Sequence, residues 1–170
     1  ISLIDDVFIT LQEGGKPDKS SIEEVVNDLY QLLMDRPDRL LGPMFKPRES
    51  RHYLSQSAVN CLILSVFMGR NLKLPNHQLA SLAVASLLHD TGMMRIPKEI
   101  LDKSGRLTDQ ELRKVRAHPI HSYKIITREL GYAEEVGVTA LYHHERWDGK
   151  GYPKQLKGKE IPLTSRILSV

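Results

Sequence analysis

Apolar residues recur along most of the chain with the period of an α-helix. Between positions 22 and 33 they are spaced three or four residues apart, and residues 78–88 are apolar almost all round. The first pattern predicts an amphipathic helix with one buried face, and the second predicts a helix in the middle of a bundle. Residues 1–15 end in Gly14-Gly15 and are ambiguous between strand and helix.

Capping residues and prolines divide the remaining pattern into further helices. Ser21-Ile22-Glu23-Glu24 and Thr108-Asp109-Gln110-Glu111 both have the form of a capping box, so each predicts a helix start. Helices are also predicted over 50–72, 97–101, 119–130 and 133–146, and a last one begins near position 162. Together these segments predict an all-α fold, a helical bundle.

A proline-rich stretch separates two parts of the chain. Residues 37–50 hold three prolines and a glycine, which is typical of a linker. We therefore predict an N-terminal segment with one helix and this linker over 1–50, and the main domain over 51–170. The chain starts at Ile1 and stops at Val170 without a natural start or stop feature, so we expect a fragment of a longer protein.

Composition excludes several classes of protein. Hydrophobic residues make up 41% and charged residues 26%, which is enough to bury a core. No apolar run approaches the ~20 residues of a membrane span. The single cysteine, Cys61, excludes a disulfide framework and a multi-cysteine zinc site, and we expect a reduced, cytoplasmic location.

Charge is distributed unevenly along the chain. Residues 1–50 carry six Lys/Arg and ten Asp/Glu, whereas residues 51–170 carry eighteen and eleven. The basic part suits an anionic ligand such as a phosphodiester, and a solvated basic surface is the alternative. The absence of a basic run and the aromatic content of only 6% argue against binding to an extended nucleic acid.

Histidines are the candidate chemical groups. His89-Asp90 ends the most apolar segment, where a buried imidazole and carboxylate need partners. His118 precedes Pro119, which disfavours helical geometry at the histidine. His143 and His144 are expected side by side on a helix, about 100° apart around its axis. These ligands suit Fe, Mn, Zn or Ni rather than Ca, but their spacing alone leaves metal binding and ordinary structural histidines equally open.

Several short motifs follow one another in a specific order. They are His89-Asp90-Thr91-Gly92, Ile96-Pro97-Lys98-Glu99-Ile100-Leu101, His118-Pro119, His143-His144-Glu145-Arg146 and Asp148-Gly149-Lys150-Gly151-Tyr152-Pro153. In this order the chain resembles the HD-GYP subfamily of the HD metal-dependent phosphohydrolase superfamily. The resemblance covers about residues 51–170.

The resemblance implies a fold, an activity and a set of site residues. The fold is a helical bundle of the HD-domain type, and the activity is hydrolysis of cyclic di-GMP by a bacterial cytoplasmic phosphodiesterase. The family holds two or three metals, usually iron or manganese, and works by two-metal hydrolysis. The residues that match its ligands are His89, Asp90, His118, His143 and His144, with Asp90 bridging two metals as the catalytic carboxylate.

A loop rich in glycine follows these ligands. Its matching residues are Asp148, Gly149, Gly151, Tyr152 and Pro153. The resemblance implies that this loop borders the substrate site or contacts a partner, such as a diguanylate-cyclase-type or other signalling protein. A tight turn without further function is the alternative, because Gly and Pro suffice for one.

Three departures from the family pattern concern the metals. Ser57 stands where the first ligand histidine is expected, and Met93 replaces a lysine. The chain also ends at Val170, before the last aspartate ligand of the family. We therefore predict at most one firmly held metal in this fragment, or an empty site.

A catalytically degenerate module for dinucleotide sensing or protein–protein interaction is the alternative to the enzyme, and a purely structural bundle is the third hypothesis.

Overall fold

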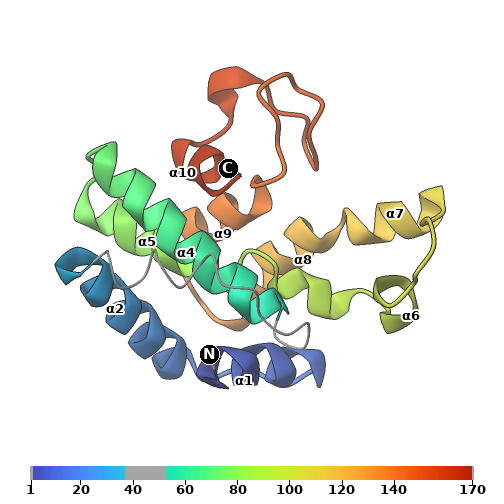
Figure 1. Cartoon of the computed structure of the whole chain (residues 1–170). Helices are drawn as coiled ribbons and strands as arrows, with labels where there is room; N and C mark the ends of the chain where they lie inside the picture. The colour runs from blue at the N-terminus through green and yellow to red at the C-terminus, as the bar shows by residue number, and fades with distance from the viewer. Residues whose placement is uncertain (1, 37–52, 170) are drawn as a thin grey trace. The chain divides into compact units, whose positions relative to one another are not determined.

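The fold is built from helices. The computed structural model describes residues 2–36 and 53–169, and over these ranges it contains helices and turns but no strand (Figure 1). One isolated antiparallel bridge joins Asp148 to Lys157. The all-α prediction is confirmed. The predicted linker at 37–50 and the boundary at position 50 lie outside the described residues, so the division at that position stays a prediction.

Backbone contacts divide the chain into two compact units, Ile1–Leu88 and His89–Val170. The first unit contains α1 (Ser2–Gln12), α2 (Lys19–Asp35), α4 (Tyr53–Asn71) and α5 (Asn76–Leu88). Within it α4 packs along α5, and α2 contacts both. The side chains at its centre are large and fully buried, and they include Leu11, Ile22, Leu33, Leu62 and Leu82.

The first unit settles one point that the sequence left open and corrects another that the sequence predicted. Residues 2–12 form the helix α1, which resolves the ambiguity left by the sequence. The start of α2 lies at Lys19, because the Asp18 carboxylate caps it by accepting hydrogen bonds from the backbone N–H groups of Ser20 and Ser21. The predicted capping box at Ser21 is therefore wrong. A carboxylate three residues earlier already satisfies the free N–H groups of the first turn.

The second unit consists of short elements around α8. Its elements in order are η2 (Thr91–Arg95), α6 (Lys98–Leu101), α7 (Asp109–Val115), α8 (His118–Lys124), η3 (Ile125–Glu129), α9 (Glu134–Leu141), η4 (Gly158–Glu160) and α10 (Leu163–Leu168). The 3-10 turn η2 and the helix α9 both pack against α8, and α10 packs against α9. This packing brings together the start of η2, the start of α8 and the end of α9.

Two expectations about the histidine-bearing segments are wrong. His118 is the first residue of α8, and it is not displaced from it by Pro119. A proline is tolerated there because the N–H groups of a first helical turn have no partner within the helix. The helix α9 ends at Leu141, so His143 and His144 lie in the turn that follows it rather than on the helix. The predicted capping box at Thr108, in contrast, is confirmed.

None of the described helices is long and apolar enough to cross a membrane.

Candidate metal centre

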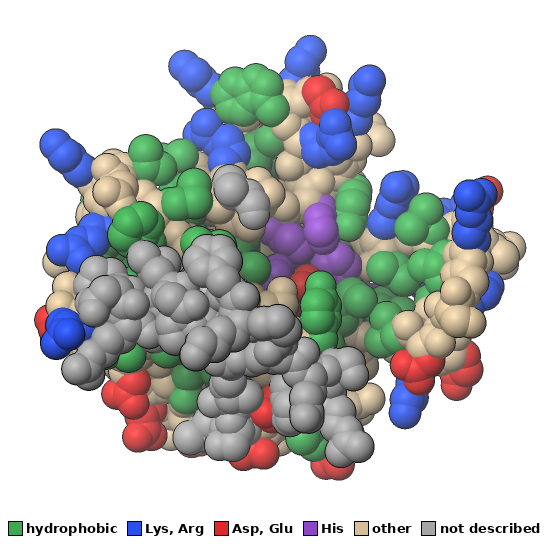
Figure 2. Space-filling view, in the orientation of Figure 1, with side chains coloured by type: hydrophobic (Ala, Val, Ile, Leu, Met, Phe, Trp, Pro, Cys, Tyr) green, Lys and Arg blue, Asp and Glu red, His purple; other side chains and the backbone are tan. Residues whose placement is uncertain are grey.

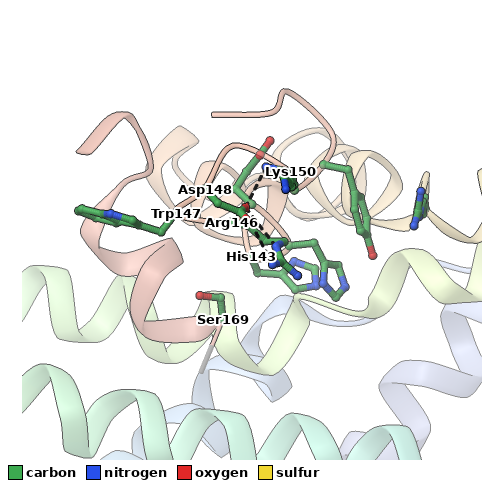
Figure 3. Close-up of a pocket in the computed structure, with 11 residues that line it drawn as sticks. His143, Arg146, Trp147, Asp148, Lys150 and Ser169 are labelled. Carbon is green, nitrogen blue, oxygen red and sulfur yellow. Dashed lines mark hydrogen bonds and ion pairs between the residues drawn. The ribbon is translucent and has the colours of Figure 1, made fainter. Parts of the chain in front are cut away.

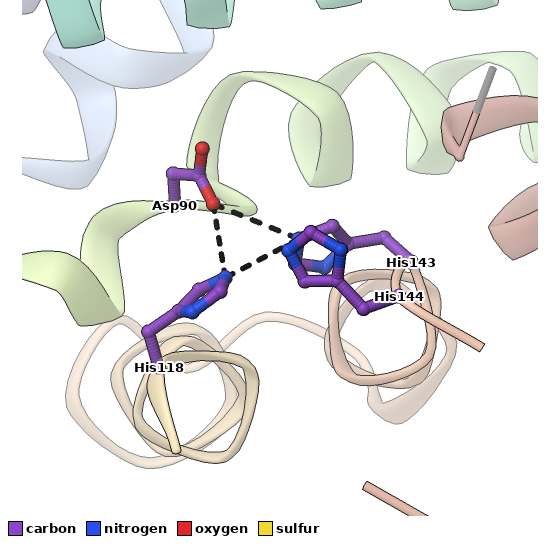
Figure 4. Close-up of side chains that lie close together, drawn as sticks. All are labelled: Asp90, His118, His143 and His144. Carbon is purple, nitrogen blue, oxygen red and sulfur yellow. Dashed lines mark hydrogen bonds and ion pairs between the residues drawn. The ribbon is translucent and has the colours of Figure 1, made fainter. Parts of the chain in front are cut away.

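Four side chains of the second unit converge on one point. They are Asp90, His118, His143 and His144, and each offers one ligand atom such that all four atoms lie within 4.8 Å of one another. Asp90 stands immediately before η2, His118 begins α8, and the two other histidines follow α9. Figure 4 shows the three imidazoles and the carboxylate pointing toward one another, and the histidines appear as one purple group in Figure 2.

The Asp90 carboxylate faces the Nε2 atoms of two of the imidazoles. Its Oδ1 lies 3.2 Å from Nε2 of His118 and 3.6 Å from Nε2 of His143. The two Nε2 atoms are 3.4 Å apart. His118 and His143 are buried, whereas Asp90 and His144 are half-buried, so the cluster can be reached from one side.

Backbone carbonyl groups fix which nitrogen of each ring carries the proton. Nδ1 of His118 lies 2.8 Å from the carbonyl oxygen of Val115, and Nδ1 of His143 lies 2.6 Å from that of Ala140. Because a carbonyl oxygen can only accept, Nδ1 is the donor in both rings, and in the neutral ring Nε2 then carries a lone pair. Two lone pairs therefore face each other and a carboxylate, an arrangement that a bound cation would stabilise.

The charge states of Asp90, His143 and His144 are those that binding of a cation requires. Burial raises the pKa of Asp90, but its contacts with the imidazoles of His118, His143 and His89 outweigh it, and the net pKa lies well below its ordinary value. Burial lowers the pKa of His143. Burial, with the nearby His143 and His118, lowers the pKa of His144 to about 3. Asp90 is thus an anion and these two imidazoles are neutral near pH 7, the states in which each can bind a metal.

His89 lies beside the four-residue cluster. Its side chain is buried, and its Nε2 lies 3.1 Å from Oδ2 of Asp90, the carboxylate oxygen that faces away from His118 and His143. The ring meets that of His143 edge to face, with 5.0 Å between the ring centres. Asp90 therefore contacts His89 through Oδ2, and His118 and His143 through Oδ1. A role for His89 as a ligand stays a prediction.

Gly92 brings η2 against the start of α8. Its N–H donates to the Ser122 hydroxyl at 2.8 Å. A Cβ atom at this position would lie 2.1 Å from the carbonyl oxygen of His118 and 2.6 Å from the backbone nitrogen of Ser122. Only glycine allows this approach, and it fixes the distance between the Asp90 and His118 backbones.

A loop follows His144 and folds back onto it. The Glu145 carboxylate is buried and accepts hydrogen bonds from the N–H groups of Lys154, at 2.6 Å, and Leu156, at 3.0 Å. The N–H of Tyr152 donates to the carbonyl oxygen of His144, and the Tyr152 ring stacks on the His144 imidazole with 4.7 Å between centres. The loop is thus fastened to the turn that carries His143 and His144.

The remaining predicted loop residues shape its tip and its end. Gly149 has a φ of 75°, a conformation that favours glycine. Asp148 accepts a hydrogen bond from the N–H of Lys150. A Cβ atom on Gly151 would collide with the backbone of His144 to Arg146, so this glycine permits the close return of the loop. Pro153 follows a cis peptide bond.

A cavity of about 750 Å³ lies between this loop and the histidines. It is lined by the following residues: Arg116, His143, His144, Glu145, Arg146, Trp147, Asp148, Lys150, Gly151, Tyr152 and Ser169. Figure 3 shows several of them around the opening, including the Arg146–Asp148 pair. Three cationic side chains line the cavity, and sequence reasoning missed the contribution of Arg116. Its position two residues before His118 is the only sequence feature that points to it.

Ser57 and Met93, the two positions that depart from the family pattern, do not belong to the four-residue cluster. Ser57 is half-buried on α4 in the first unit, and Met93 is half-buried in η2. His77 is exposed and His121 is half-buried, and neither belongs to the cluster. The roles suggested for Ser57 and Met93 stay predictions.

Comparison with known proteins identifies the class. The sequence model of the HD domain family matches residues 23–170. The chain belongs to the HD domain family, which confirms the resemblance seen in its motifs. A solved HDG"Y"P protein from Bdellovibrio bacteriovorus has the same fold, with a TM-score of 0.76 at 19% identity, over 98% of this chain and 54% of that one.

Curated relatives are more similar in sequence. A cyclic di-GMP phosphodiesterase of Pseudomonas aeruginosa is 31% identical over 96% of this chain. The cyclic di-GMP phosphodiesterase PdeB of Borreliella burgdorferi is 36% identical over 72% of this chain. The chain spans 39% and 32% of the lengths of these two relatives, respectively.

Proposed function

We propose that this protein is a metal-dependent phosphodiesterase that hydrolyses cyclic di-GMP in bacterial second-messenger signalling. One observation carries the proposal: the Nε2 atoms of two imidazoles, whose Nδ1 atoms are held by carbonyl groups, face a half-buried carboxylate beside a cavity lined by three cationic side chains. The names of the curated relatives support the substrate, and we place the reaction in the cytoplasm.

Asp90, His118, His143 and His144 are the residues that would hold a divalent metal, with His89 next to them. The donor set of imidazoles and one carboxylate suits Fe or Mn, as the family resemblance also implies. When bound, such a metal supplies Lewis acidity to a phosphoryl group. The protein's own part is to keep the Nε2 atoms unprotonated and aimed at one point. The carbonyl groups of Val115 and Ala140 do this through the Nδ1 atoms.

The cavity suits a dianionic dinucleotide. Its volume of about 750 Å³ falls within the range of small-molecule sites, roughly 300–1,000 Å³. Arg116, Arg146 and Lys150 supply positive charge at its wall, next to His143 and His144. A substrate phosphate that reaches the imidazoles thus lies near cations that offset its charge.

Hydrolysis and metal content test the proposal together. The chain is loaded with Mn²⁺ or, without oxygen, with Fe²⁺, and cyclic di-GMP turnover is followed by separating the products. We expect turnover by the parent chain and a loss of at least a hundredfold in Asp90→Asn, together with loss of the metal. Asp102→Asn is the matched control, because Asp102 is exposed and does not line the cavity. Full turnover by Asp90→Asn would contradict the site assignment.

A second candidate function is a module that binds the dinucleotide or a signalling protein without hydrolysing it. Ser57 favours it, because a neutral hydroxyl, a poor metal ligand, stands where the family resemblance expects a histidine. Tight binding of cyclic di-GMP without turnover in either metal would favour this candidate over the enzyme.

A further inference from the structure

Arg116 stands apart from the other two cations of the cavity by how it is held. Its guanidinium lies over the ring of Tyr152, with 5.5 Å from Cζ to the ring centre. The same ring also stacks on the imidazole of His144. Arg116, Tyr152 and His144 therefore form a column that ends at the histidine cluster, although they come from the end of α7 and from two points in the loop segment.

The column leaves the hydrogen-bonding edge of the guanidinium available. A cation–π contact uses the flat face of the group, and its five N–H donors lie in the plane. In the ranges 2–36 and 53–169, no carboxylate forms an ion pair with Arg116. An arginine whose position is fixed through its face while its donors stay free is suited to bind a phosphate through two parallel hydrogen bonds.

The other cations of the cavity do not have this combination. Arg146 donates from Nε and Nη2 to the two carboxylate oxygens of Asp148, at 3.2 and 3.0 Å, so its donor edge is occupied. Lys150, like Arg116, is exposed, but its compact ammonium group has no planar donor pair. Of the three, Arg116 alone is both held in place and free to donate.

We propose that Arg116, held by the Tyr152 ring, is the side chain that recognises a phosphate of the substrate in the cavity. This inference rests on the proposed function for the identity of that substrate. It also assigns Tyr152 a positioning role, because its ring already contacts both Arg116 and His144.

Titration of the metal-free chain tests this assignment, because no hydrolysis then consumes the ligand. Cyclic di-GMP is titrated calorimetrically into the parent chain and into Arg116→Ala, Tyr152→Leu and Tyr152→Phe. We expect Arg116→Ala to weaken binding by about ten- to a hundredfold, the range of a charge-assisted hydrogen-bonded pair. Tyr152→Leu should approach that loss, whereas Tyr152→Phe, which keeps the ring, should retain most of the affinity.

Arg113→Ala is the matched control. Arg113 lies on the last turn of α7, is exposed and does not line the cavity, so the variant removes the same charge from the same helix. Circular dichroism and thermal unfolding of every variant identify loss of fold, and Arg116→Lys serves as the folded substitute if Arg116→Ala unfolds. We expect Arg116→Lys to bind at least fivefold more weakly than the parent, because an ammonium group cannot make the paired hydrogen bonds.

The outcomes separate this inference from the proposed function. If the parent binds cyclic di-GMP and Arg116→Ala binds it within twofold of the parent affinity, the assignment of Arg116 is wrong. The same holds if Lys150→Ala, and not Arg116→Ala, loses affinity. In both cases the proposed substrate stands. If the parent binds cyclic di-GMP neither without metal nor after loading with Mn²⁺, the proposed substrate is wrong, and the same chains are titrated with inorganic pyrophosphate. Loss of pyrophosphate binding in Arg116→Ala alone would then support the anion site, and equal or absent binding would overturn it.

With the metal-loaded chain, the kinetic constants give a second measurement. A phosphate contact made equally in the ground state and the transition state raises KM and leaves kcat nearly unchanged. We therefore expect Arg116→Ala to raise KM and to leave kcat nearly unchanged. A fall in kcat with unchanged KM would contradict a binding role.

Discussion

Glu111 gathers three hydrogen bonds at the start of α7. Its Oε2 accepts from the ammonium group of Lys103 at 2.6 Å, from the backbone N–H of Thr108 at 2.7 Å and from the Thr108 hydroxyl at 3.0 Å. The bond from Lys103, followed by those from Thr108, lowers the pKa of Glu111 to about 2. Because the folded pKa is below the unfolded value of about 4.5, these bonds stabilise the fold above that pH.

We predict that this contribution is lost as the pH falls from about 4.5 to about 2, since the unfolded chain then binds the proton more strongly than the folded chain. Glu111→Gln should therefore lower the urea midpoint at pH 6 but change it much less at pH 2.5. Urea unfolding at both values measures the effect. An equal shift at the two values would show that the ionised carboxylate is not responsible.

Gly92 provides a residue-scale test of how the cluster is assembled. Gly92→Ala places a methyl group against backbone atoms of His118 and Ser122, which can only be relieved by moving η2 away from α8. We predict destabilisation by about 1–3 kcal/mol and weaker metal binding, because Asp90 and His118 then separate. Gly105→Ala is the control, since a Cβ there would meet no atom within 4 Å. Urea unfolding and Mn²⁺ titration measure both effects, and equal results for the two variants would contradict the explanation.

Single residues also show what the sequence can predict. The identity of the clustered residues followed from motif order, and the chemistry of their side chains followed from residue type. The importance of Arg116 and the buried carboxylate of Glu145 did not, because both depend on partners that are distant in the chain. A glycine such as Gly92 is recognisable as special, but only the structure shows that close approach, and not an unusual φ, requires it.

At the scale of elements, local signals located helices better than they located helix ends. Thr108 and Glu111 lie within one turn, so the start of α7 could be predicted. The end of α9 at Leu141 could not be predicted, because no glycine or proline stands there. A turn follows the helix. In this turn the His144 carbonyl oxygen accepts a hydrogen bond from the N–H of Tyr152, and the Glu145 carboxylate accepts one from the N–H of Lys154 in the loop. Those contacts span eight or more residues, beyond the reach of local patterns.

Glu145 is the contact that holds the loop as an element. Glu145→Gln replaces one carboxylate oxygen by an NH₂ group, which cannot accept the hydrogen bond from Lys154 or Leu156. We predict that amide hydrogen exchange at these two positions becomes at least tenfold faster, and that the fold is destabilised by about 1.5–3 kcal/mol. Exchange measured by NMR tests this.

Glu160→Gln is the comparison for the loop. Glu160 is exposed and accepts from the N–H of Lys157, so its variant should speed exchange at Lys157 and leave Lys154 and Leu156 protected. Unchanged protection of Lys154 and Leu156 in Glu145→Gln would show that other contacts hold the loop.

For the whole molecule, the described ligands predict one metal ion per chain. The four clustered residues all belong to the unit His89–Val170. At a free Mn²⁺ concentration a hundredfold above its dissociation constant, binding would stabilise the folded state by about 2.7 kcal/mol. For a chain of this length we expect the Tm to rise by about 5–10 °C. Native mass spectrometry measures the metal count, and calorimetry measures the Tm.

Asp90→Asn should abolish the rise in Tm produced by Mn²⁺. Two tightly bound ions per chain, or the same rise in Tm in that variant, would contradict the predicted metal count or its location.

The all-α class and the membership of the HD domain family were predictable at this scale, because they depend on periodicity and motif order over the whole chain. The division into two compact units at position 88 was not, since α5 runs directly into His89 without a proline or glycine between them.

The carbonyl contacts of His118 and His143 have a consequence for protein design. In each case the oxygen that orients the imidazole belongs to the residue three positions earlier in the chain. The direction of each ligand is therefore encoded within four consecutive residues and requires no second side chain. Segments 115–118 and 140–143 could be transplanted as cassettes onto another scaffold that reproduces their spacing and supplies a carboxylate between them.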